Sequence, residues 1–520
     1  MVVGDRIRNG MLFECVHTET LDGLKMQTAK NTIVRRKKAG AIGLAASPEI
    51  PAQRAIPGRR RVISVARWAA LAGLVLLSGC AGLSGSGKYK IRVIDRENGW
   101  PVPMVALRTH NQTFHVTDNN GWIAIDSPEL LGRPVWFDVE GSGYETDKDA
   151  LGLHGVTLTP VRGGSAVVKL KRMLPAKRLG RLTGAGLFAE SQKLGMEKNW
   201  KESGVLGCDS VQLARHGSGL YWAWGDTLTF ANPIGIFHAT GAVTDAKAAI
   251  FLNPPVRPAF HYFRDGQGQV RGLAQMPGEG PTWLGGMTSL PGRDGKPHLV
   301  SAYMKARGAL EIHETGLVVW NEKTNTFELL KKLWRSSSKG EKPPPYPDGH
   351  PTRWIAPDGT ERLLFGDPFP RLEMPATFEA WGDPSQWRVL KPQRSVMSKD
   401  GGEKVVPHRG SIAWSKHLQK WVAIFTQYGG KPSHLGEIWF ATSKQPTGPW
   451  SNAIKVASHG GRTLYNPRIH AEVPGLPANI LLFEGTLSTS FANNPAPLPR
   501  HDYNQILYRL DLDDFTDDNF

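Results

Sequence analysis

The chain has 520 residues, a formal net charge of +16 and three cysteines. Hydrophobic residues make up 40% of it and charged residues 21%, so a large core can form and wholesale disorder is excluded. Three cysteines exclude a disulfide scaffold, and none are paired at zinc-site spacing. The 58 glycines and 38 prolines exceed the usual share, which is typical of many short strands joined by turns.

The first 80 residues have the plan of an export signal. Residues 59–61 are three arginines, an apolar run follows from Val62, and the segment ends in Leu-Ser-Gly-Cys at 77–80. A basic start, an apolar run too short to span a bilayer and small residues at the end are typical of a secretory signal. The last four residues resemble a bacterial lipobox, which implies lipidation of Cys80 and anchoring to a membrane of the cell envelope. The alternatives are a plain signal peptide or a short anchor helix. Residues 1–58 form an upstream extension that we expect to be absent from the mature protein.

This segment also accounts for half of the net charge. Residues 1–79 hold 13 lysines and arginines and 5 acidic residues, and the other 441 residues carry the same net charge of +8. A strongly basic chain suggests a nucleic-acid partner, but the mature part shows no basic cluster with interleaved aromatic residues. We therefore expect no nucleic-acid partner, and we expect export to the periplasmic side or the outer-membrane surface.

Two small regions precede the main repeat. Residues 81–87 form a tether. Alternating apolar residues and turn signals over 88–172 predict a small β-sandwich, with strands near 89–95, 102–109, 121–126, 134–139 and 165–171. The turns at 95–103 and 117–121 resemble those of carboxypeptidase-regulatory-like modules, which implies a spacer or accessory role. Residues 173–204 are expected to form a basic connector.

Residues 205–520 divide into five segments of similar plan. Each begins with polar or glycine residues on a strand and ends in an outer strand. Five repeats of a four-stranded unit predict an all-β fold, a five-bladed β-propeller, with an array of β-sandwiches as the alternative. The segments begin near 207–209, 283–286, 349–351, 408–410 and 465–467, and the outer strands are expected at 241–244, 315–320, 376–381, 437–442 and 505–511.

Several motifs resemble carbohydrate-active propellers. Ser443 to Trp450 resembles the S-x-x-P-x-G-P-W turn of arabinanase- and xylosidase-type glycoside hydrolases. Asp209-Ser210 with Trp222 to Thr227 resembles the opening of a propeller family that includes endo-D-arabinanases. The stretches 465–472, 483–486 and 499–505 are similar to uncharacterised secreted bacterial propellers. The resemblance implies a carbohydrate substrate and hydrolysis of a glycosidic bond.

Glycoside hydrolysis needs two carboxyl groups, one ionised and one held protonated. Asp209 begins the first inner strand, and Asp226 lies 17 residues later, where a hairpin would return it to the same end. By analogy we assign Asp209 as base or nucleophile and Asp226 as acid or pKa modulator, roles that are interchangeable at this stage. Each aspartate could instead cap a local turn.

Competing acids lie in the last segment. His470 and Glu472 alternate on one strand and so share a face, and Glu484 follows one hairpin later. Glu484 could instead be a buried partner of Arg468 or Arg500. Glu437 is a weaker candidate because it flanks an outer strand.

Histidines provide two further alternatives. His350, His408 and His470 could hold a metal, with a structural calcium on the propeller axis as the one cofactor considered, or could be ordinary hydrogen-bonded side chains. A site dominated by His, Tyr and Arg would favour β-elimination by a polysaccharide lyase, and Arg409, Arg500, His501 and Tyr503 keep that option open. A non-catalytic glycan-binding propeller is the third candidate. The residues expected to contact the sugar are Trp224, Trp283, His350, His408, Arg409, Asn466, His470, Arg500 and Tyr503, although core packing is the default for each tryptophan.

Overall fold

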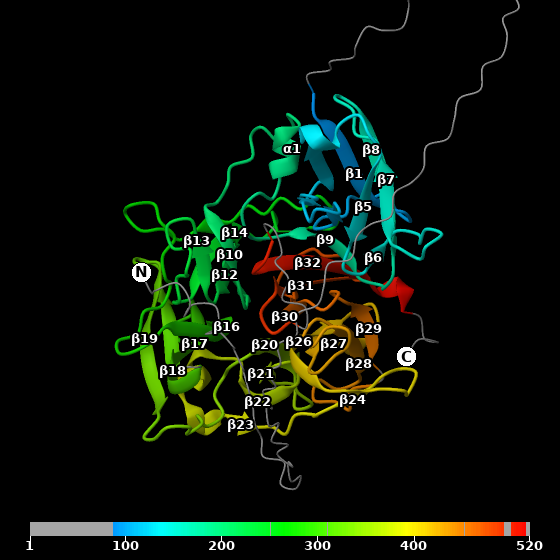
Figure 1. The fold of residues 1–520 in the computed structure, drawn as a ribbon. Helices are drawn as coiled ribbons and strands as arrows, with labels where there is room; N and C mark the ends of the chain where they lie inside the picture. Colours follow the sequence, from blue (N-terminus) through cyan, green and yellow to red (C-terminus); the bar gives the residue numbers. More distant parts are fainter. Residues whose placement is uncertain (1–86, 250, 309, 452, 493–500, 516–520) are drawn as a thin grey trace, which may run out of the picture. The chain divides into compact units, whose positions relative to one another are not determined.

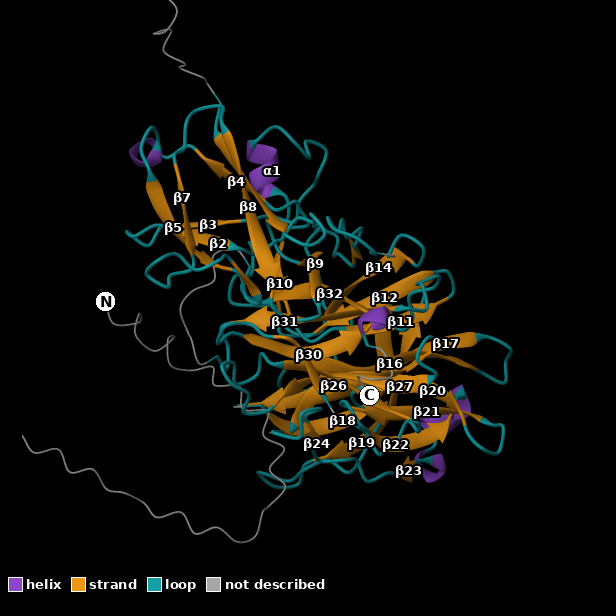
Figure 2. Cartoon of the chain, turned by 90° about the vertical axis from the view of Figure 1, so that its right-hand side faces the viewer, coloured by secondary structure: helices purple, strands orange, loops and turns teal. Residues whose placement is uncertain are grey.

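The computed structural model describes residues 87–249, 251–308, 310–451, 453–492 and 501–515. The predicted signal segment, Cys80 and Arg500 lie outside these residues. Strands dominate the described chain, as predicted for an all-β protein, and its α-helices are the short α1 (Ala189–Lys193) and α2 (Phe378–Gly382) (Figures 1 and 2). Within the described residues, no helix has the length and apolar character needed to cross a bilayer.

The first described region contains two four-stranded sheets that share one hydrophobic core. Their strand orders are β4-β1-β8-β6 and β3-β2-β5-β7. Alternate residues of β1 point inward, and Ile91 and Val93 pack there with Leu107 and Phe137 from the other sheet. The strands are β1 (Tyr89–Asp95), β2 (Ala106–Arg108), β3 (Phe114–Val116), β4 (Trp122–Ile125), β5 (Val135–Glu140), β6 (Tyr144–Glu145), β7 (Gly155–Leu158) and β8 (Ser165–Arg172).

The rest of the chain forms five four-stranded antiparallel sheets, here called sheets 1 to 5, each built almost entirely from consecutive strands. Sheet 1 contains β11 (Gln212–His216), β12 (Gly219–Trp224), β14 (Thr240–Asp245) and β15 (His261–Tyr262). Sheet 2 contains β16 (Thr282–Pro291), β17 (Pro297–Arg307), β18 (Glu311–Asn321) and β19 (Thr326–Arg335). Sheet 3 contains β20 (His350–Ile355), β21 (Glu361–Gly366), β22 (Pro370–Pro375) and β23 (Arg388–Val389).

Sheets 4 and 5 follow the same plan. Sheet 4 contains β26 (Pro407–Ser415), β27 (Lys420–Gln427), β28 (Ile438–Ser443) and β29 (Ile454–Ala457). Sheet 5 contains β30 (Thr463–Ile469), β31 (Ile480–Ser488), β32 (Asn504–Asp511) and, as its outer strand, β9 (Lys177–Arg181). Two-stranded ribbons add β10 (Val205–Cys208) with β13 (Thr227–Thr229), and β24 (Val396–Met397) with β25 (Lys404–Val405).

The hydrophobic core lies between successive sheets. One apolar cluster fills each of the gaps between sheets 1 and 2, 2 and 3, 3 and 4, and 4 and 5. A fifth cluster joins Leu213 and Trp222 of sheet 1 to Leu482 and Leu507 of sheet 5. Because the last sheet packs on the first as each sheet packs on the next, the five sheets close into a circle.

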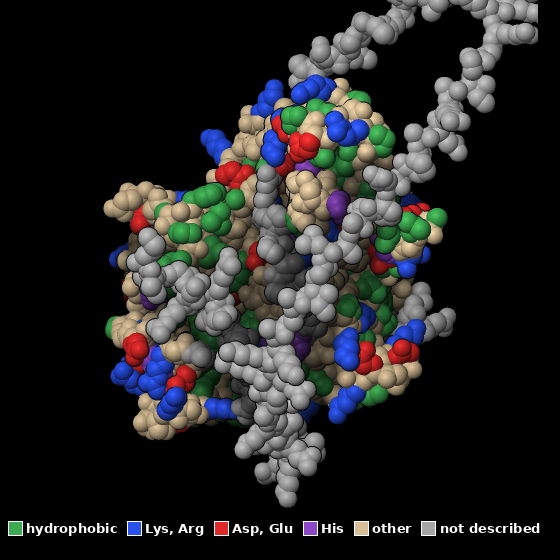
Figure 3. Space-filling view, viewed as in Figure 1, with side chains coloured by type: hydrophobic (Ala, Val, Ile, Leu, Met, Phe, Trp, Pro, Cys, Tyr) green, Lys and Arg blue, Asp and Glu red, His purple; other side chains and the backbone are tan. Residues whose placement is uncertain are grey.

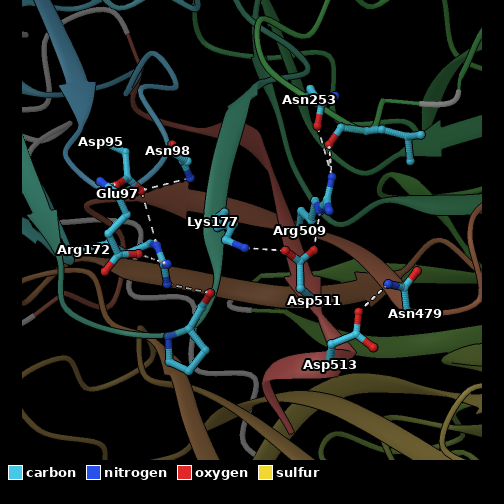
Figure 4. Close-up of polar contacts among 12 residues, drawn as sticks. Asp95, Glu97, Asn98, Arg172, Lys177, Asn253, Asn479, Arg509, Asp511 and Asp513 are labelled. Atoms are coloured by element: carbon cyan, nitrogen blue, oxygen red, sulfur yellow. Dashed lines mark hydrogen bonds and ion pairs between the residues drawn. The ribbon is translucent and has the colours of Figure 1, made fainter.

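Strand β9 corrects the predicted domain boundary. Residues 173–204 were expected to be a connector, but Lys177–Arg181 pairs with β32 and completes sheet 5. Figure 1 shows β9 beside β32, and Figure 4 shows the Lys177 ammonium on the Asp511 carboxylate. Burial by itself raises the pKa of Asp511, but the hydrogen bonds from Arg509 and Lys177 lower it overall. A strand that precedes sheet 1 in the sequence therefore completes sheet 5.

One predicted outer strand is wrong. Residues 376–381 were expected to be extended, whereas β22 ends at Pro375 and Phe378–Gly382 is helix α2. Thr377 caps this helix, because its side chain accepts a hydrogen bond from the Ala380 amide. The other four predicted strands exist, but each is the third strand of its sheet, with a further strand outside it.

Candidate active site

The inner strands of all five sheets begin at one end of the circle, here called the mouth, and the backbone is irregular there. Ser210 and Gly349, just before β11 and β20, and Gly286 and Asn466, within β16 and β30, have φ of 55°, 85°, 65° and 49°. In β26 the register shifts between Pro407 and Gly410, as it does in β16 and β30. Such bulges redirect side chains. These positions coincide with the five segment starts seen in the sequence.

The two aspartates lie opposite each other at the mouth. In the ribbon of β10 and β13, Cys208 pairs with Thr227, and Asp209 and Asp226 are the next residues toward the mouth. The Asp209 amide donates to the Asp226 carbonyl at 3.3 Å, and the Asp209 carbonyl accepts from the Gly225 amide at 2.8 Å. Asp209 thus faces both Gly225 and Asp226 across a bulge. The structure brings together the two carboxyl groups that the hairpin argument paired.

Gly225 makes room for the Asp209 carboxylate. A Cβ built on Gly225 would lie 2.3 Å from Asp209 Oδ1, closer than real Cβ atoms approach any atom. Any larger residue at position 225 would therefore have to displace the Asp209 carboxylate. The signal of Gly225 in the sequence is only its position beside Asp226.

Two tyrosines from sheet 5 bind Asp209. The Tyr465 hydroxyl donates to Asp209 Oδ2 at 3.0 Å, and the Tyr503 hydroxyl also hydrogen-bonds the carboxylate. Burial raises the pKa of Asp209 to about 6, while the hydrogen bonds from Tyr503 and Tyr465 act in the opposite direction by stabilising the ionised form. Tyr503 was expected at the site. Tyr465 was noted only as a segment start.

Asp226 has a different environment. It is 8% exposed, and its Oδ1 accepts a hydrogen bond of 2.9 Å from the Trp283 indole. Burial and the adjacent Asp209 charge raise the pKa of Asp226 to about 8. When the pair loses its first proton, the charge therefore settles on Asp209, and Asp226 stays protonated at neutral pH.

The two tyrosines act as donors. Burial, followed by the charge of Asp209, raises the pKa of Tyr465 and of Tyr503 well above the usual value. Both hydroxyls therefore keep their protons at any physiological pH. A tyrosinate base at this site would have to form against both effects.

A second layer of hydrogen bonds ties sheet 5 to the residue after Asp209. The Asn466 amide donates to Ser210 Oγ at 2.6 Å, and the Ser210 backbone amide donates to Thr486 Oγ1 at 3.0 Å. Gln505 Nε2 donates to Thr486 Oγ1 and to the Cys208 carbonyl. Asn466, predicted to contact substrate, donates its side-chain N–H to Ser210 in the structure.

The predicted residues of sheets 3 and 4 lie at the beginnings of the inner strands β20 and β26, and His501 precedes β32 of sheet 5. His350 is 7% exposed, and burial followed by the charge of Arg468 lowers its pKa to about 3, so it is neutral. Arg409 forms an ion pair with Asp367, whose other oxygen accepts from the Gly410 amide at 2.8 Å. The His408 ring lies 6.1 Å from the ring of Tyr428. His501 is 4% exposed.

Trp224 is a correction. It was proposed as a sugar-stacking surface, but it is 1% exposed and belongs to the core between sheets 5 and 1. Its ring is stacked near that of Trp222 at 6.4 Å. Successive side chains of β12 point to opposite faces of sheet 1. Trp224 points into the gap between sheets 5 and 1, and Ala223 points into the gap between sheets 1 and 2. Trp283 is half-buried, with its indole N–H donated to Asp226.

The competing acids of the last segment are also corrections. Glu484 and His470 are each 1% exposed and face each other at 3.3 Å beside the ring of Trp222, within the core between sheets 5 and 1. Glu472 pairs with the buried Arg468, which also donates to the Leu213 carbonyl. Glu472 is thus paired with an internal arginine, and Glu484 is enclosed in the core beside His470.

Glu437, the weaker acid candidate, is bound by neighbouring side chains. Glu437 is fully buried and bonded to Lys455 and Ser458 at 2.8 Å each.

Among the described residues, no group of three or more His, Cys, Asp and Glu side chains is arranged to hold a metal ion. His350, His408 and His470 thus do not assemble into a common metal-binding cluster.

Comparison with known proteins gives only distant similarity. No protein-family model matches this chain, and no curated protein does. An N-acetylgalactosamine deacetylase from F. plautii aligns over 60% of this chain and 91% of its own, with 11% identity and a TM-score of 0.35. An exo-β-1,3-galactanase from Phanerochaete chrysosporium aligns over 59% of this chain and 62% of its own, with 8% identity and a TM-score of 0.34. The native arabinanase of Bacillus subtilis aligns over 59% of this chain and 95% of its own, with 15% identity and a TM-score of 0.29. Similarities at this level carry no argument about family or function.

Proposed function

We propose that this protein is a glycoside hydrolase that uses Asp209 and Asp226 as its catalytic pair. In this proposal the five sheets are the blades of a five-bladed propeller, and residues 88–172 are an accessory β-sandwich. The observation that carries the proposal is the pair itself, two carboxyl groups facing each other at the mouth in environments that separate their pKa values. Hydrolysis of a glycosidic bond requires such a separation.

We assign the roles from the environments of the two carboxyl groups. Asp209 accepts two tyrosine hydroxyls and has the lower pKa, so it is the ionised nucleophile or base. Asp226 has the pKa of about 8 and is the general acid that protonates the departing oxygen. Trp283 holds the Asp226 carboxyl through Oδ1 and leaves its other oxygen to carry the proton.

The backbone bonds among Asp209, Gly225 and Asp226 make the two aspartates immediate neighbours, and we take retention of configuration, which uses the shorter carboxyl separation, as part of the proposal. Retaining enzymes have carboxyl groups about 5–5.5 Å apart, whereas inverting enzymes leave about 6.5–9.5 Å for a water molecule. Asp209 then attacks the anomeric carbon while Asp226 gives its proton to the leaving oxygen. Water activated by the Asp226 carboxylate subsequently releases the sugar from Asp209.

The environment of the tyrosines argues against β-elimination. A lyase needs a tyrosine or histidine that can accept a proton, and here Tyr465 and Tyr503 have raised pKa values. The group beside these tyrosines that can accept a proton is the Asp209 carboxylate, which suits hydrolysis better than elimination. A glycan-binding protein without activity would need no carboxyl pair buried against its own repulsion.

Export and lipidation are part of the proposal and rest on the sequence alone. A signal ending in Leu-Ser-Gly-Cys80 would place the enzyme on the cell envelope, where polysaccharides are accessible. Metabolic labelling with a palmitate analogue should mark the wild-type protein and spare Cys80→Ala. Equal labelling of both would refute lipidation at Cys80.

The test of the enzymatic proposal is a panel of soluble arabinan, arabinogalactan, xylan and pectin. Released reducing ends report hydrolysis, and ultraviolet absorbance of unsaturated uronates reports elimination. Asp209→Asn and Asp226→Asn should each lose activity, and Asp265→Asn, an exposed aspartate of a turn near sheet 1, is the matched control. Proton NMR of the first product should show the anomer of the substrate.

Each outcome decides a separate part of the proposal. Full activity of Asp209→Asn or Asp226→Asn would refute the site, and an inverted first product would refute retention. Unsaturated products would replace hydrolysis by elimination. A panel with no cleavage would refute the enzymatic proposal, and binding without cleavage would leave a glycan-binding role in its place.

A further inference from the structure

The loop between β13 and β14 exposes three large apolar side chains, of which Phe237 lies at the Asp226 end of β13 and the other two lie near the turn at the opposite end. Phe230 is 69% exposed, Ile234 is 75% exposed and Phe237 is 38% exposed. Figure 3 shows hydrophobic side chains gathered on the side where β13 lies in Figure 1. Exposed phenylalanines leave apolar area in contact with water, and such side chains are candidates for binding a ligand where they lie near a site.

Phe237 stands opposite Asp226. The Thr227 amide donates to the Ile236 carbonyl at 3.0 Å, and the Ile236 amide donates back to Thr227 at 2.7 Å. This mutual pair makes Thr227 and Ile236 direct neighbours across the two strands, and the next pair toward the mouth is Asp226 and Phe237. Side chains of opposite residues lie on the same face. The side chain of Phe237 therefore leaves its strand on the same face as the side chain of Asp226, and its ring lies over Gly235, two residues earlier.

The base of this loop is fixed to the indole that binds Asp226. His238 Nδ1 accepts a hydrogen bond of 3.1 Å from the Thr282 amide, and the Ala239 amide donates to the Thr282 carbonyl at 2.9 Å. Thr282 precedes Trp283, whose N–H binds Asp226. The backbone directly after Phe237 is thus fixed to the strand that carries Trp283.

We propose that Phe237 is the stacking platform for the sugar on the leaving-group side of the scissile bond, and this inference rests on the proposed function. The general acid must contact the departing oxygen, so the side chain next to it faces the departing group. An exposed phenyl ring offers a flat apolar surface for the C–H face of a sugar. The substrate is then an oligosaccharide or polysaccharide whose departing group is itself a sugar, rather than a glycoside of a small alcohol.

The experiment measures binding without turnover. Asp209→Asn protein is run in native gels containing soluble arabinan, arabinogalactan, xylan or pectin, and its retardation gives the dissociation constant of each. The same measurement is made on Asp209→Asn with Phe237→Ala and on Asp209→Asn with Ile234→Ala. Ile234 is the matched control because it is an exposed apolar residue of the same loop. Thermal melting verifies that all three are folded.

Phe237→Ala should weaken binding about tenfold, the usual effect of losing an aromatic anchor, and Ile234→Ala should change it less than about twofold. In the active protein, Phe237→Ala should lower kcat/KM for the polymer and spare hydrolysis of the corresponding glycosyl fluoride, whose departing group occupies no sugar site.

Unchanged polymer binding by Phe237→Ala would overturn the platform and leave the hydrolase proposal intact. Loss of polymer and glycosyl fluoride hydrolysis together would also overturn it, because the residue would then act at the catalytic step. Equal weakening by Ile234→Ala would indicate a general apolar contact and refute a specific platform. If no polymer retards the protein in the gel while the glycosyl fluoride is still hydrolysed, the platform is refuted and the hydrolase proposal stands. Binding of the same variants to phosphatidylglycerol vesicles is measured by co-sedimentation. If Phe237→Ala loses binding to the vesicles but not to the polymers, the loop contacts a membrane and the platform is overturned.

Discussion

Replacing Tyr465 by phenylalanine should shift the acidic limb of the pH–activity profile upward. Tyr465 donates one of the two tyrosine hydrogen bonds to Asp209. A hydrogen bond to a charged group contributes about 1.5–3 kcal/mol. A change of one in pKa corresponds to about 1.36 kcal/mol, so the full loss would raise the pKa of Asp209 by about one to two. Since the Tyr503 bond remains, we expect the pKa to rise by about one.

The sign follows from which form the bond stabilises. Tyr465 favours the ionised carboxylate, so its removal makes Asp209 harder to ionise and raises its pKa from about 6. The fraction of enzyme with ionised Asp209 then falls about tenfold below that pH, because a pKa higher by one makes the ionisation constant ten times smaller. The alkaline limb, which reports Asp226, should move much less.

The assay is kcat/KM on a soluble substrate from about pH 4 to about pH 9, because this ratio reports the ionisations of the free enzyme. Tyr221→Phe is the matched control, since Tyr221 lies on β12 and packs against Phe263 and Trp320 in the gap between sheets 1 and 2. An acidic limb that stays in place in Tyr465→Phe would refute Asp209 as the group that must be ionised. An equal displacement of the limb in Tyr221→Phe would attribute the effect to altered packing.

Three further outcomes follow from the same geometry. Asp226→Asn should raise the melting temperature more at about pH 9 than at about pH 4, because a carboxyl whose folded pKa is raised loses stability as pH rises from its ordinary pKa of 3.8 to about 8; an equal gain at both pH values would contradict this. Gly225→Ala should lower kcat at least about tenfold by displacing Asp209, as a misplacement of about 1 Å does, while Gly266→Ala, whose Cβ meets open space, should not. Trp224→Ala should lower the free energy of unfolding by about 3–5 kcal/mol in denaturant titration, and a conservative Trp224→Phe should leave KM unchanged, which a stacking role would not allow.

The sequence predicted what depends on local pattern. Turn residues and alternation identified the strands of the five sheets, because a glycine or asparagine at positive φ leaves a local signal. The pairing of Asp209 with Asp226 followed from a hairpin, which is also local. The S-x-x-P-x-G-P-W turn is structural, since Trp450 is 4% exposed and its backbone amide is bonded by Gln393.

The errors arose where distant segments meet. Nothing in residues 177–181 shows that they pair with a strand more than 300 residues away. Trp224 and Glu484 looked like site residues because their motifs are polar and aromatic, but sheet 5 packs against sheet 1 and buries both. The sequence does not show that Tyr465 binds Asp209, because the two residues are 256 positions apart. Phe237 belongs to a loop whose register is set by a single bridge.

The meeting of sheets 1 and 5 has a consequence for the order in which the site is completed. Asp209 lies just before the first of the five sheets in the chain, and the tyrosines that bind it come with the last sheet. A nascent chain can therefore contain both aspartates before it contains Tyr465 and Tyr503. In the proposed hydrolase the hydroxyls that stabilise the charge on Asp209 are thus added last, and a chain interrupted before Tyr465 would have the carboxyl pair without them.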